Sequence, residues 1–179
     1  MTLQQHTLDN GLTVILEENH SAPVVSMNIA VKVGSAMETD AEAGISHFIE
    51  HILFKGTPTR AVGQIAHDVE AAGGDINAYT SFDQTVYYIN MASRFANEGL
   101  DILCDAIQNP LFDQIETEKE CEVICEEIRR GQDNPSSLFS ENLFRNTYGK
   151  HLYGRPIIGF EKVVKSFTGK DLKKFWKKW

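Results

Sequence analysis

The stretch GISHFIEHILFKGT, residues 44–57, decides both the fold and the chemistry expected of this chain. It places two histidines, His47 and His51, one helical turn apart, with Glu50 between them. Residues four apart lie on one helix face, about 6 Å apart at Cβ, so both imidazoles can reach one metal ion. Glu50 lies on the flank of that face, where its carboxylate can take a proton from water. With only six histidines in 179 residues, this H-x-x-E-H spacing favours a zinc site over a chance match.

A catalytic zinc site needs a third protein ligand and an open position for water. The candidates lie in the acid-rich segment 115–135, which the spacing of its apolar residues predicts to be a helix. Glu120 and Glu127 are seven apart and share one face, but an acidic helix is most often a solvated surface. The residues themselves therefore leave six candidates: Glu116, Glu118, Glu120, Glu122, Glu126 and Glu127. Cys121 and Cys125 could hold a soft metal, but without a second cysteine pair they are better explained as core thiols.

The rest of the chain predicts one α+β domain. Asn10-Gly11 is typical of a tight hairpin turn, and Thr39 begins a capping box. The apolar patterns predict strands at 2–8, 12–18, 24–35, 75–81 and 84–92, and helices at about 41–54, 60–72, 95–108, 113–131 and 136–147. Residues 153–167 look irregular, and Thr168 caps a last helix that runs to Trp179. We therefore expect an antiparallel-rich sheet with helices packed on one side.

Composition excludes several classes of protein. The apolar fraction of 42% and charged fraction of 23% are those of a folded soluble domain, and a net charge of −8 argues against nucleic-acid binding. No apolar run is long enough to span a membrane, and the N-terminus lacks a secretory leader pattern. Three cysteines suit free thiols in a reducing cytoplasm. A final helix bearing Phe175, Trp176 and Trp179 indicates a chain cut from a longer one.

With these residues in hand, the chain resembles the N-terminal half of the M16 metallopeptidases. That family includes pitrilysin, insulin-degrading enzyme and the mitochondrial processing peptidase, and its signature is H-x-x-E-H followed by a distant glutamate. The likeness covers nearly the whole chain and is strongest to the processing-peptidase-like branch, including its bacterial members. Besides the opening stretch, it rests on the blocks LDNGLTVILEE, GGDINAYTSFDQTVYY, EKECEVICEEI and YGRPIIG.

The resemblance implies roles that spacing could not assign. It implies the metallopeptidase α/β-roll fold, Zn²⁺ as cofactor, and Glu127 as the third ligand beside His47 and His51. It implies that Glu120 supports the site without binding the ion. It also implies that Asn77 and Ala78, in NAYT, lie on an edge strand that holds the backbone of an extended peptide substrate, a mode of β-augmentation.

The resemblance also implies what the chain lacks. Residues 1–179 would form a single N-terminal catalytic domain, truncated from a subunit of two similar halves. A C-terminal half or a partner subunit, in a homo- or heterodimer, would complete the substrate chamber. The expected function is zinc-dependent endopeptidase or oligopeptidase activity on peptides in a bacterial cytoplasm, with no membrane partner. The alternative is an incomplete module that binds zinc or peptide without cleaving.

Overall fold

The computed structural model describes residues 2–179. The strands are β1 (Leu3–Thr7), β2 (Thr13–Glu17), β3 (Val24–Val31), β4 (Asp75–Thr80) and β5 (Thr85–Ala92). The α-helices are α1 (Ile45–Ile52), α2 (Gln64–Ala71), α3 (Ala96–Gln108), α4 (Gln114–Asp133), α5 (Pro135–Tyr148), α6 (Glu161–Val164) and α7 (Gly169–Lys178). Short 3-10 turns occur at Ser35–Met37, Asp40–Glu42, Ser93–Phe95 and Leu152–Gly154.

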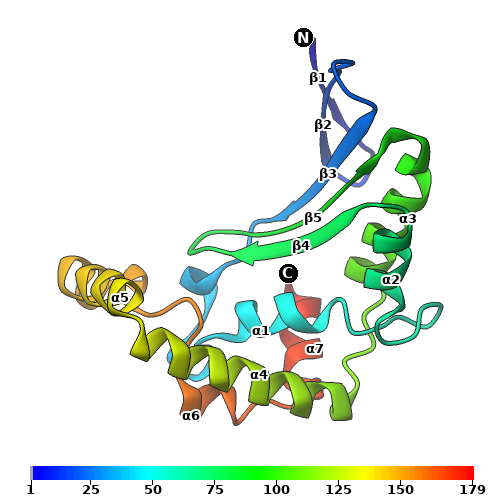
Figure 1. The fold of residues 1–179 in the computed structure, drawn as a ribbon. Helices are drawn as coiled ribbons and strands as arrows, with labels where there is room; N and C mark the ends of the chain where they lie inside the picture. The colour runs from blue at the N-terminus through cyan, green and yellow to red at the C-terminus, as the bar shows by residue number, and fades with distance from the viewer. Residues whose placement is uncertain (1) are drawn as a thin grey trace.

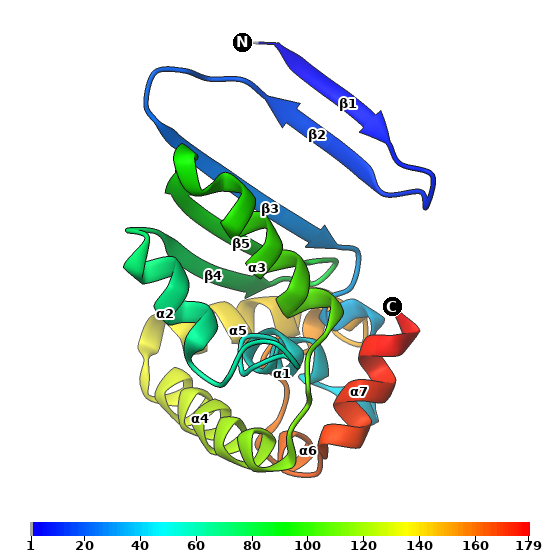
Figure 2. The same ribbon diagram turned by 90° about the vertical axis from the view of Figure 1, so that its right-hand side faces the viewer.

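The strands form two antiparallel sheets. β1 pairs with β2 through the turn around Asn10-Gly11, and this hairpin stands apart from the other strands (Figure 2). The second sheet has the order β3-β5-β4, with Tyr87 of β5 opposite both Ile29 and Ala78. β5 is therefore the central strand, and β4 is an edge strand.

One face of the three-stranded sheet carries the helices (Figure 1). Alternate residues of β3 and β4 are half-buried and exposed, as expected when one face meets a core and the other meets solvent. The central strand β5 is buried along most of its length. Fully buried side chains from the sheet and from every α-helix except α5 build the core; they include Phe48, Ile52, Ile89, Leu103, Ile124 and Leu172. The α+β fold with helices on one side of an antiparallel sheet is thus as expected.

The first long helix begins later than the sequence predicts. The capping box of Thr39 and Glu42 is present, but it caps a 3-10 turn, and α1 starts only after Gly44, whose φ is +95°. Gly44 packs against Gly159, which also has a positive φ, and a Cβ on Gly44 would lie 2.5 Å from the Ile158 carbonyl oxygen. Only glycine fits here, so the chain must turn before the histidine helix can begin.

Two buried side chains, Glu38 and Arg155, fix the start of α1; Oε2 of Glu38 lies 3.8 Å from a guanidinium nitrogen of Arg155. The Glu38 carboxylate accepts the backbone N–H groups of Gly44 and Ser46, both at 2.9 Å. Arg155 donates to the backbone carbonyls of Ser35 and Glu38 at 2.7 and 2.8 Å. Burial raises the pKa of Glu38 to about 7, against the lowering effect of the two N–H groups. The block YGRPIIG therefore supports the helix that carries the histidines.

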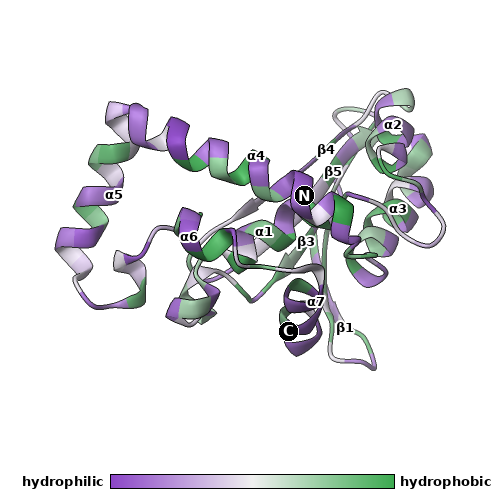
Figure 3. Ribbon diagram, turned by 90° about the horizontal axis from the view of Figure 1, so that it is seen from below, coloured by the Kyte–Doolittle hydropathy of each residue, from purple (hydrophilic) through white to green (hydrophobic). Residues whose placement is uncertain are grey.

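The second half of the chain is mainly helical. Asp113 caps α4 and Asn134 caps α5, so a single residue separates the two helices. No residue of α5 is buried, and hydrophilic and hydrophobic residues alternate along it where it projects from the end of α4 (Figure 3). The segment expected to be irregular contains the short helix α6. Within residues 2–179 no helix is long and apolar enough to cross a membrane.

Candidate metal centre

The centre lies between α1 and α4, which run in opposite directions. His47 and His51 come from α1, as their spacing predicts, and Glu127 comes from α4. The Nε2 atoms of His47 and His51 lie 3.8 and 3.7 Å from the same carboxylate oxygen, Oε2 of Glu127. The structure therefore brings together two imidazoles and one carboxylate, from segments far apart in the sequence.

These donor atoms fit a zinc ion. One ligand atom from each residue can be chosen so that all three lie within 4.8 Å of one another. Ligand atoms of a tetrahedral zinc lie about 3.4 Å apart, because each is about 2.0–2.1 Å from the ion. The two distances from the histidine Nε2 atoms to Oε2 of Glu127, 3.8 and 3.7 Å, exceed this value by only a few tenths of an ångström. Three protein ligands with nitrogen and oxygen donors leave the fourth position for water, which is the composition of a catalytic zinc site.

Burial keeps the His47 imidazole in the neutral form that can bind a metal ion. Its side chain is 13% exposed, and burial, with a smaller effect of His51, lowers the pKa of His47 to about 3. The imidazole is therefore neutral at ordinary pH, the form that binds metal. Its Nδ1 atom is buried and has no hydrogen-bond partner among the described residues. The Glu127 side chain is half exposed, so the centre opens towards solvent on the α4 side.

Glu120 stands behind His51. Its Oε2 atom lies 3.2 Å from Nδ1 of His51, and its Oε1 atom lies 2.7 Å from Nζ of Lys55. Burial opposes the charge on Glu120, but the hydrogen bonds to His51 and Lys55 outweigh it and lower the pKa of the carboxyl group. A carboxylate on the far nitrogen of a ligating histidine fixes the tautomer and orientation of the ring. This geometry agrees with a supporting role for Glu120.

Glu50 lies beside the imidazoles and contacts the sheet. The Thr80 hydroxyl of β4 donates a hydrogen bond to Oε2 of Glu50. Burial raises the pKa of Glu50 above its ordinary value, and the hydroxyl group offsets this only in part. Glu50 is thus a half-buried carboxylate held in place beside the three candidate metal ligands, a position suited to proton transfer.

Asn77 and Ala78 lie on β4, the edge strand that packs against α1. The Asn77 side chain is on the exposed face, and its Oδ1 atom accepts the backbone N–H of Ala78 at 2.9 Å. That N–H points away from β5, towards the free edge of the sheet. Thr80 lies two residues further on the same strand face as Ala78, so this edge leads directly to Glu50.

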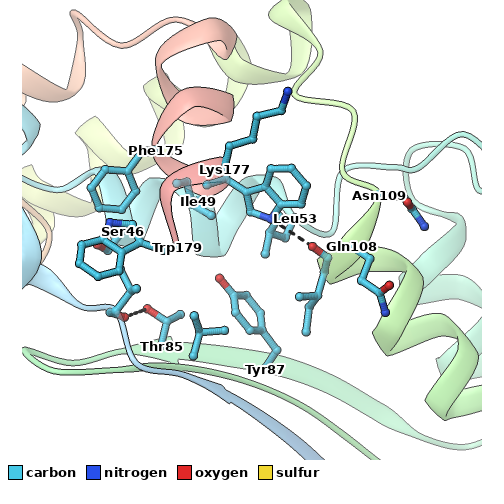
Figure 4. A pocket seen from close by; sticks show the side chains of 14 residues that line it. Ser46, Ile49, Leu53, Thr85, Tyr87, Gln108, Asn109, Phe175, Lys177 and Trp179 are labelled. Atoms are coloured by element: carbon cyan, nitrogen blue, oxygen red, sulfur yellow. Dashed lines mark hydrogen bonds between the residues drawn. The ribbon is translucent and has the colours of Figure 1, made fainter. Parts of the chain in front are cut away.

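Two cavities flank α1. One, of about 820 Å³, opens beside His47 and Glu127 and extends along α4, α5 and residues 154–161. The other, of about 580 Å³, lies on the opposite flank of α1, where Ile49 and Leu53 face Tyr87 and Phe175 (Figure 4). Its lining is mainly apolar and includes none of the metal-centre side chains. α1 thus presents an apolar face to the core and a separate polar face to α4.

The structure brings most of the predicted site residues together, and two side chains that the sequence did not single out contact them. Five of the predicted residues, His47, Glu50, His51, Glu120 and Glu127, form one cluster, and Asn77 and Ala78 lie on the adjacent strand. Lys55 was missed, although it follows His51 at the spacing that separates the two histidines. Thr80 was missed because only the packing of β4 on α1 brings it to Glu50.

Comparison with known proteins identifies relatives across most of the chain. Residues 13–161 match the sequence profile of the insulinase family, peptidase family M16. An uncharacterized zinc protease from Rickettsia felis is 44% identical over 161 residues, which cover 90% of this chain and 39% of that protein. A probable mitochondrial-processing peptidase subunit beta from Arabidopsis thaliana is 36% identical, covering 96% of this chain and 32% of that protein.

Solved structures agree with this relationship. The crystal structure of a protease from Helicobacter pylori superposes with a TM-score of 0.91 at 31% identity, over 97% of this chain and 42% of that one. The chain spans about two fifths of the length of the curated relatives that it matches.

Proposed function

The chain belongs to the insulinase family of M16 peptidases, and from this membership and the geometry of the centre we propose that it is the zinc-dependent catalytic part of an endopeptidase or oligopeptidase. The observation that carries the proposal is the convergence of His47, His51 and Glu127 on one point beside a half-buried Glu50. The names of the relatives, zinc protease and processing peptidase, describe the same chemistry in those proteins.

In this proposal His47, His51 and Glu127 hold Zn²⁺. Zinc bound there would supply Lewis acidity, which makes water a better nucleophile at neutral pH and polarises a carbonyl oxygen. Glu120 keeps the His51 ring in the orientation that directs Nε2 towards Glu127. The neutral state of His47 makes its Nε2 available without loss of a proton.

Glu50 acts as the proton carrier. It accepts a proton from the attacking water while the water oxygen bonds to the scissile carbonyl carbon. It then delivers that proton to the peptide nitrogen as the carbon–nitrogen bond breaks, so the products are a free carboxyl group and a free amine. The Thr80 hydroxyl holds the Glu50 carboxylate in place during both transfers.

The free edge of β4 supplies a place for the substrate. An extended peptide can add to this edge as a further strand, with its backbone paired to Ala78 and next to the Asn77 amide. The strand leads from Ala78 to Thr80 and so brings a peptide bond to Glu50. The cavity beside His47 and Glu127 has room for side chains of that peptide.

The second candidate is an incomplete module that binds zinc and peptide but does not cleave. It is favoured by the length of the chain, which spans about two fifths of its curated relatives. In that case a C-terminal half or partner subunit, in a homo- or heterodimer, would complete the chamber around the centre. Both candidates use the same zinc ligands and differ only in turnover.

One experiment separates the candidates. The purified chain is analysed for zinc by atomic absorption and then mixed with a quenched fluorogenic peptide, with and without a metal chelator. Zinc at one equivalent with chelator-sensitive cleavage supports the peptidase. One equivalent of zinc without cleavage supports the incomplete module, and a chain that binds no zinc at micromolar concentration refutes both.

A further inference from the structure

We propose that Lys55 is a positioning residue of the metal centre: its ammonium group holds Glu120 where that carboxylate accepts the Nδ1–H of His51. The inference rests on the proposed zinc site and adds a residue from outside the H-x-x-E-H stretch. It assigns Lys55 an effect on the affinity for zinc, exerted through Glu120 and His51, without contact with the ion.

The geometry is a chain of three side chains. Nζ of Lys55 lies 2.7 Å from one oxygen of Glu120, and Nδ1 of His51 lies 3.2 Å from the other. Each oxygen of the carboxylate therefore has its own partner, which fixes the plane of the group. The Glu120 side chain is only 8% exposed, so water does little to hold it. A buried carboxylate without a counter-charge is strongly unfavourable, and Lys55 supplies that charge.

The backbone after α1 places Lys55 beside Glu120. His47 and His51 lie one turn apart on the side of α1 that faces α4, and Lys55, four residues further on, lies just after α1 ends at Ile52. The turn after α1 continues this direction, because the Lys55 N–H donates to the Ile52 carbonyl at 3.0 Å. Gly56, with φ of +109°, then reverses the chain directly after Lys55. On α4, Glu127 and Glu120 face these side chains.

An ordinary surface pair on the same helix provides the contrast. Lys119 lies 2.6 Å from Glu116, but the Lys119 side chain is 63% exposed and the pair touches no histidine. Such pairs contribute little to stability and nothing to a metal site. Lys55 is 34% exposed and its partner is almost fully buried against His51. The two pairs share a chemical type, but Lys55 is less exposed than Lys119, and of the two glutamates only Glu120 contacts a histidine.

Loss of the ammonium group should therefore weaken the binding of zinc. Without Lys55, Glu120 lowers its energy by turning one oxygen towards water, and the His51 ring loses the acceptor that fixes its tautomer. Partners that orient a metal-binding histidine change metal affinity by about 10–100-fold when removed. We expect the lower end of this range, because the Glu120 carboxylate itself remains.

The test measures zinc affinity of the purified chain by competition with a chromophoric chelator. Lys55→Met should weaken zinc binding about 10-fold. Lys55→Arg, which keeps the charge, should stay within about 3-fold of the unsubstituted chain, and Lys119→Met should not change the affinity. In a Glu120→Gln background, Lys55→Met should have no further effect, because a shared pathway makes the two changes non-additive.

A spectroscopic measurement reports the positioning itself. In ¹⁵N-labelled protein the Nδ1–H of His51 should give a downfield proton resonance that Lys119→Met retains and Lys55→Met loses or shifts. Circular dichroism checks that each variant is folded. If Lys55→Met does not fold, Lys55→Gln, which keeps a polar side chain without the charge, takes its place with the same expected loss of affinity.

The outcomes are distinct. Zinc bound by the unsubstituted chain, with equal affinity in folded Lys55→Met or Lys55→Gln, overturns the inference and leaves the proposed function standing. Tighter binding in these variants also overturns it, since it would mean that the cation only repels zinc. No zinc binding by the unsubstituted chain refutes the proposed function itself.

Discussion

The Thr80 hydroxyl on β4 donates a hydrogen bond to the Glu50 carboxylate on α1. This contact joins the edge strand offered to a peptide with the residue proposed to move the proton. A peptide that paired with β4, as proposed, would lie against a carboxylate that is already oriented. The relationship leads to the first prediction.

Thr80→Val should lower kcat for peptide cleavage about 10-fold and leave KM and zinc content unchanged. Valine has the shape of threonine but cannot donate to Glu50, and a hydrogen bond to a charged group is worth about 1.5–3 kcal/mol. Steady-state kinetics with a fluorogenic peptide measures the change. Thr80→Ser, which keeps the hydroxyl, should recover most of the rate; equal rates for both variants would show that the hydroxyl has no catalytic role.

Glu50→Gln should retain one equivalent of zinc and lose peptide cleavage by about 10²–10⁴-fold. The amide has the size of the carboxylate but cannot accept the proton of water. Atomic absorption measures the zinc, and the cleavage rate is measured on the same sample. Cleavage at the original rate would remove Glu50 from the mechanism, whereas loss of zinc would make it part of the binding site.

Zinc should raise the thermal midpoint of the chain, because a ligand bound only by the folded state stabilises it. Zinc at about 100 times its Kd adds about 2.7 kcal/mol, which corresponds to roughly 5–10 °C for a domain of this size. Glu127→Ala should abolish most of this shift. Glu126→Ala is the matched control, because Glu126 is a half-exposed neighbour of Glu127 whose ion pairs, among residues 2–179, are with arginines of α4. Differential scanning calorimetry with and without a chelator provides the measurement.

Ala78→Pro should weaken peptide binding about 10-fold while the chain remains folded. Proline removes the N–H that points towards the free edge of β4, and edge strands tolerate proline better than central strands do. Fluorescence polarisation of a labelled extended peptide, in a Glu50→Gln background that prevents cleavage, measures the affinity. Ala78→Ser keeps the N–H and should bind as the unsubstituted chain does; an equal loss in both would point to the side chain instead.

Asp105→Asn should destabilise the chain by about 2 kcal/mol near neutral pH, with no effect on zinc. Burial disfavours the Asp105 charge, but hydrogen bonds from Thr57, Asn109 and Thr59, with Arg60, outweigh it and lower its pKa to about 2. A carboxyl group whose folded pKa lies below its unfolded value stabilises the fold above the unfolded value, about pH 4. That contribution is lost as the pH falls through about 2.

Urea denaturation at about pH 7 and about pH 2.5 measures this effect. The difference in unfolding free energy between Asp105→Asn and the unsubstituted chain should shrink at the lower pH. Asp101→Asn is the control: Asp101 also pairs with Arg60, but its side chain is 75% exposed and should contribute under about 1 kcal/mol. A constant difference across this range would assign the stabilisation to packing instead of charge.

The sequence predicted the elements whose cause is local. Alternation in β3, the strand at β4, the Asn10-Gly11 turn and the Thr168 cap of α7 depend on neighbouring residues, and all are present. The start of α1 was placed too early, because the capping box at Thr39 is genuine but Gly44 must adopt a positive φ against Gly159. That contact joins segments far apart in the chain, and no local pattern contains it.

In the candidate centre, too, the sequence predicted the residues whose placement has a local cause and left open those placed by tertiary packing. The pairing of His47 with His51 follows from helical spacing, whereas residue spacing left the third ligand open among six glutamates. The crossing of α1 and α4 places Glu127 beside the imidazoles and Glu120 behind His51. Family resemblance had pointed to the same two residues. Neither spacing nor resemblance pointed to Thr80 or Lys55, because only the packing of the fold brings Thr80 to Glu50 and Lys55 to Glu120.

The contact of Gly44 with Gly159 bears on how short a chain could still form the proposed zinc site. The histidine helix begins against a loop that the chain makes only after α5, and Arg155 of that loop anchors the residues before α1. A shortened chain that ended after α4 would still contain every proposed zinc ligand. It would nevertheless lack the loop that packs against Gly44 and binds the residues before α1, so we expect the ligands alone to be insufficient for zinc binding.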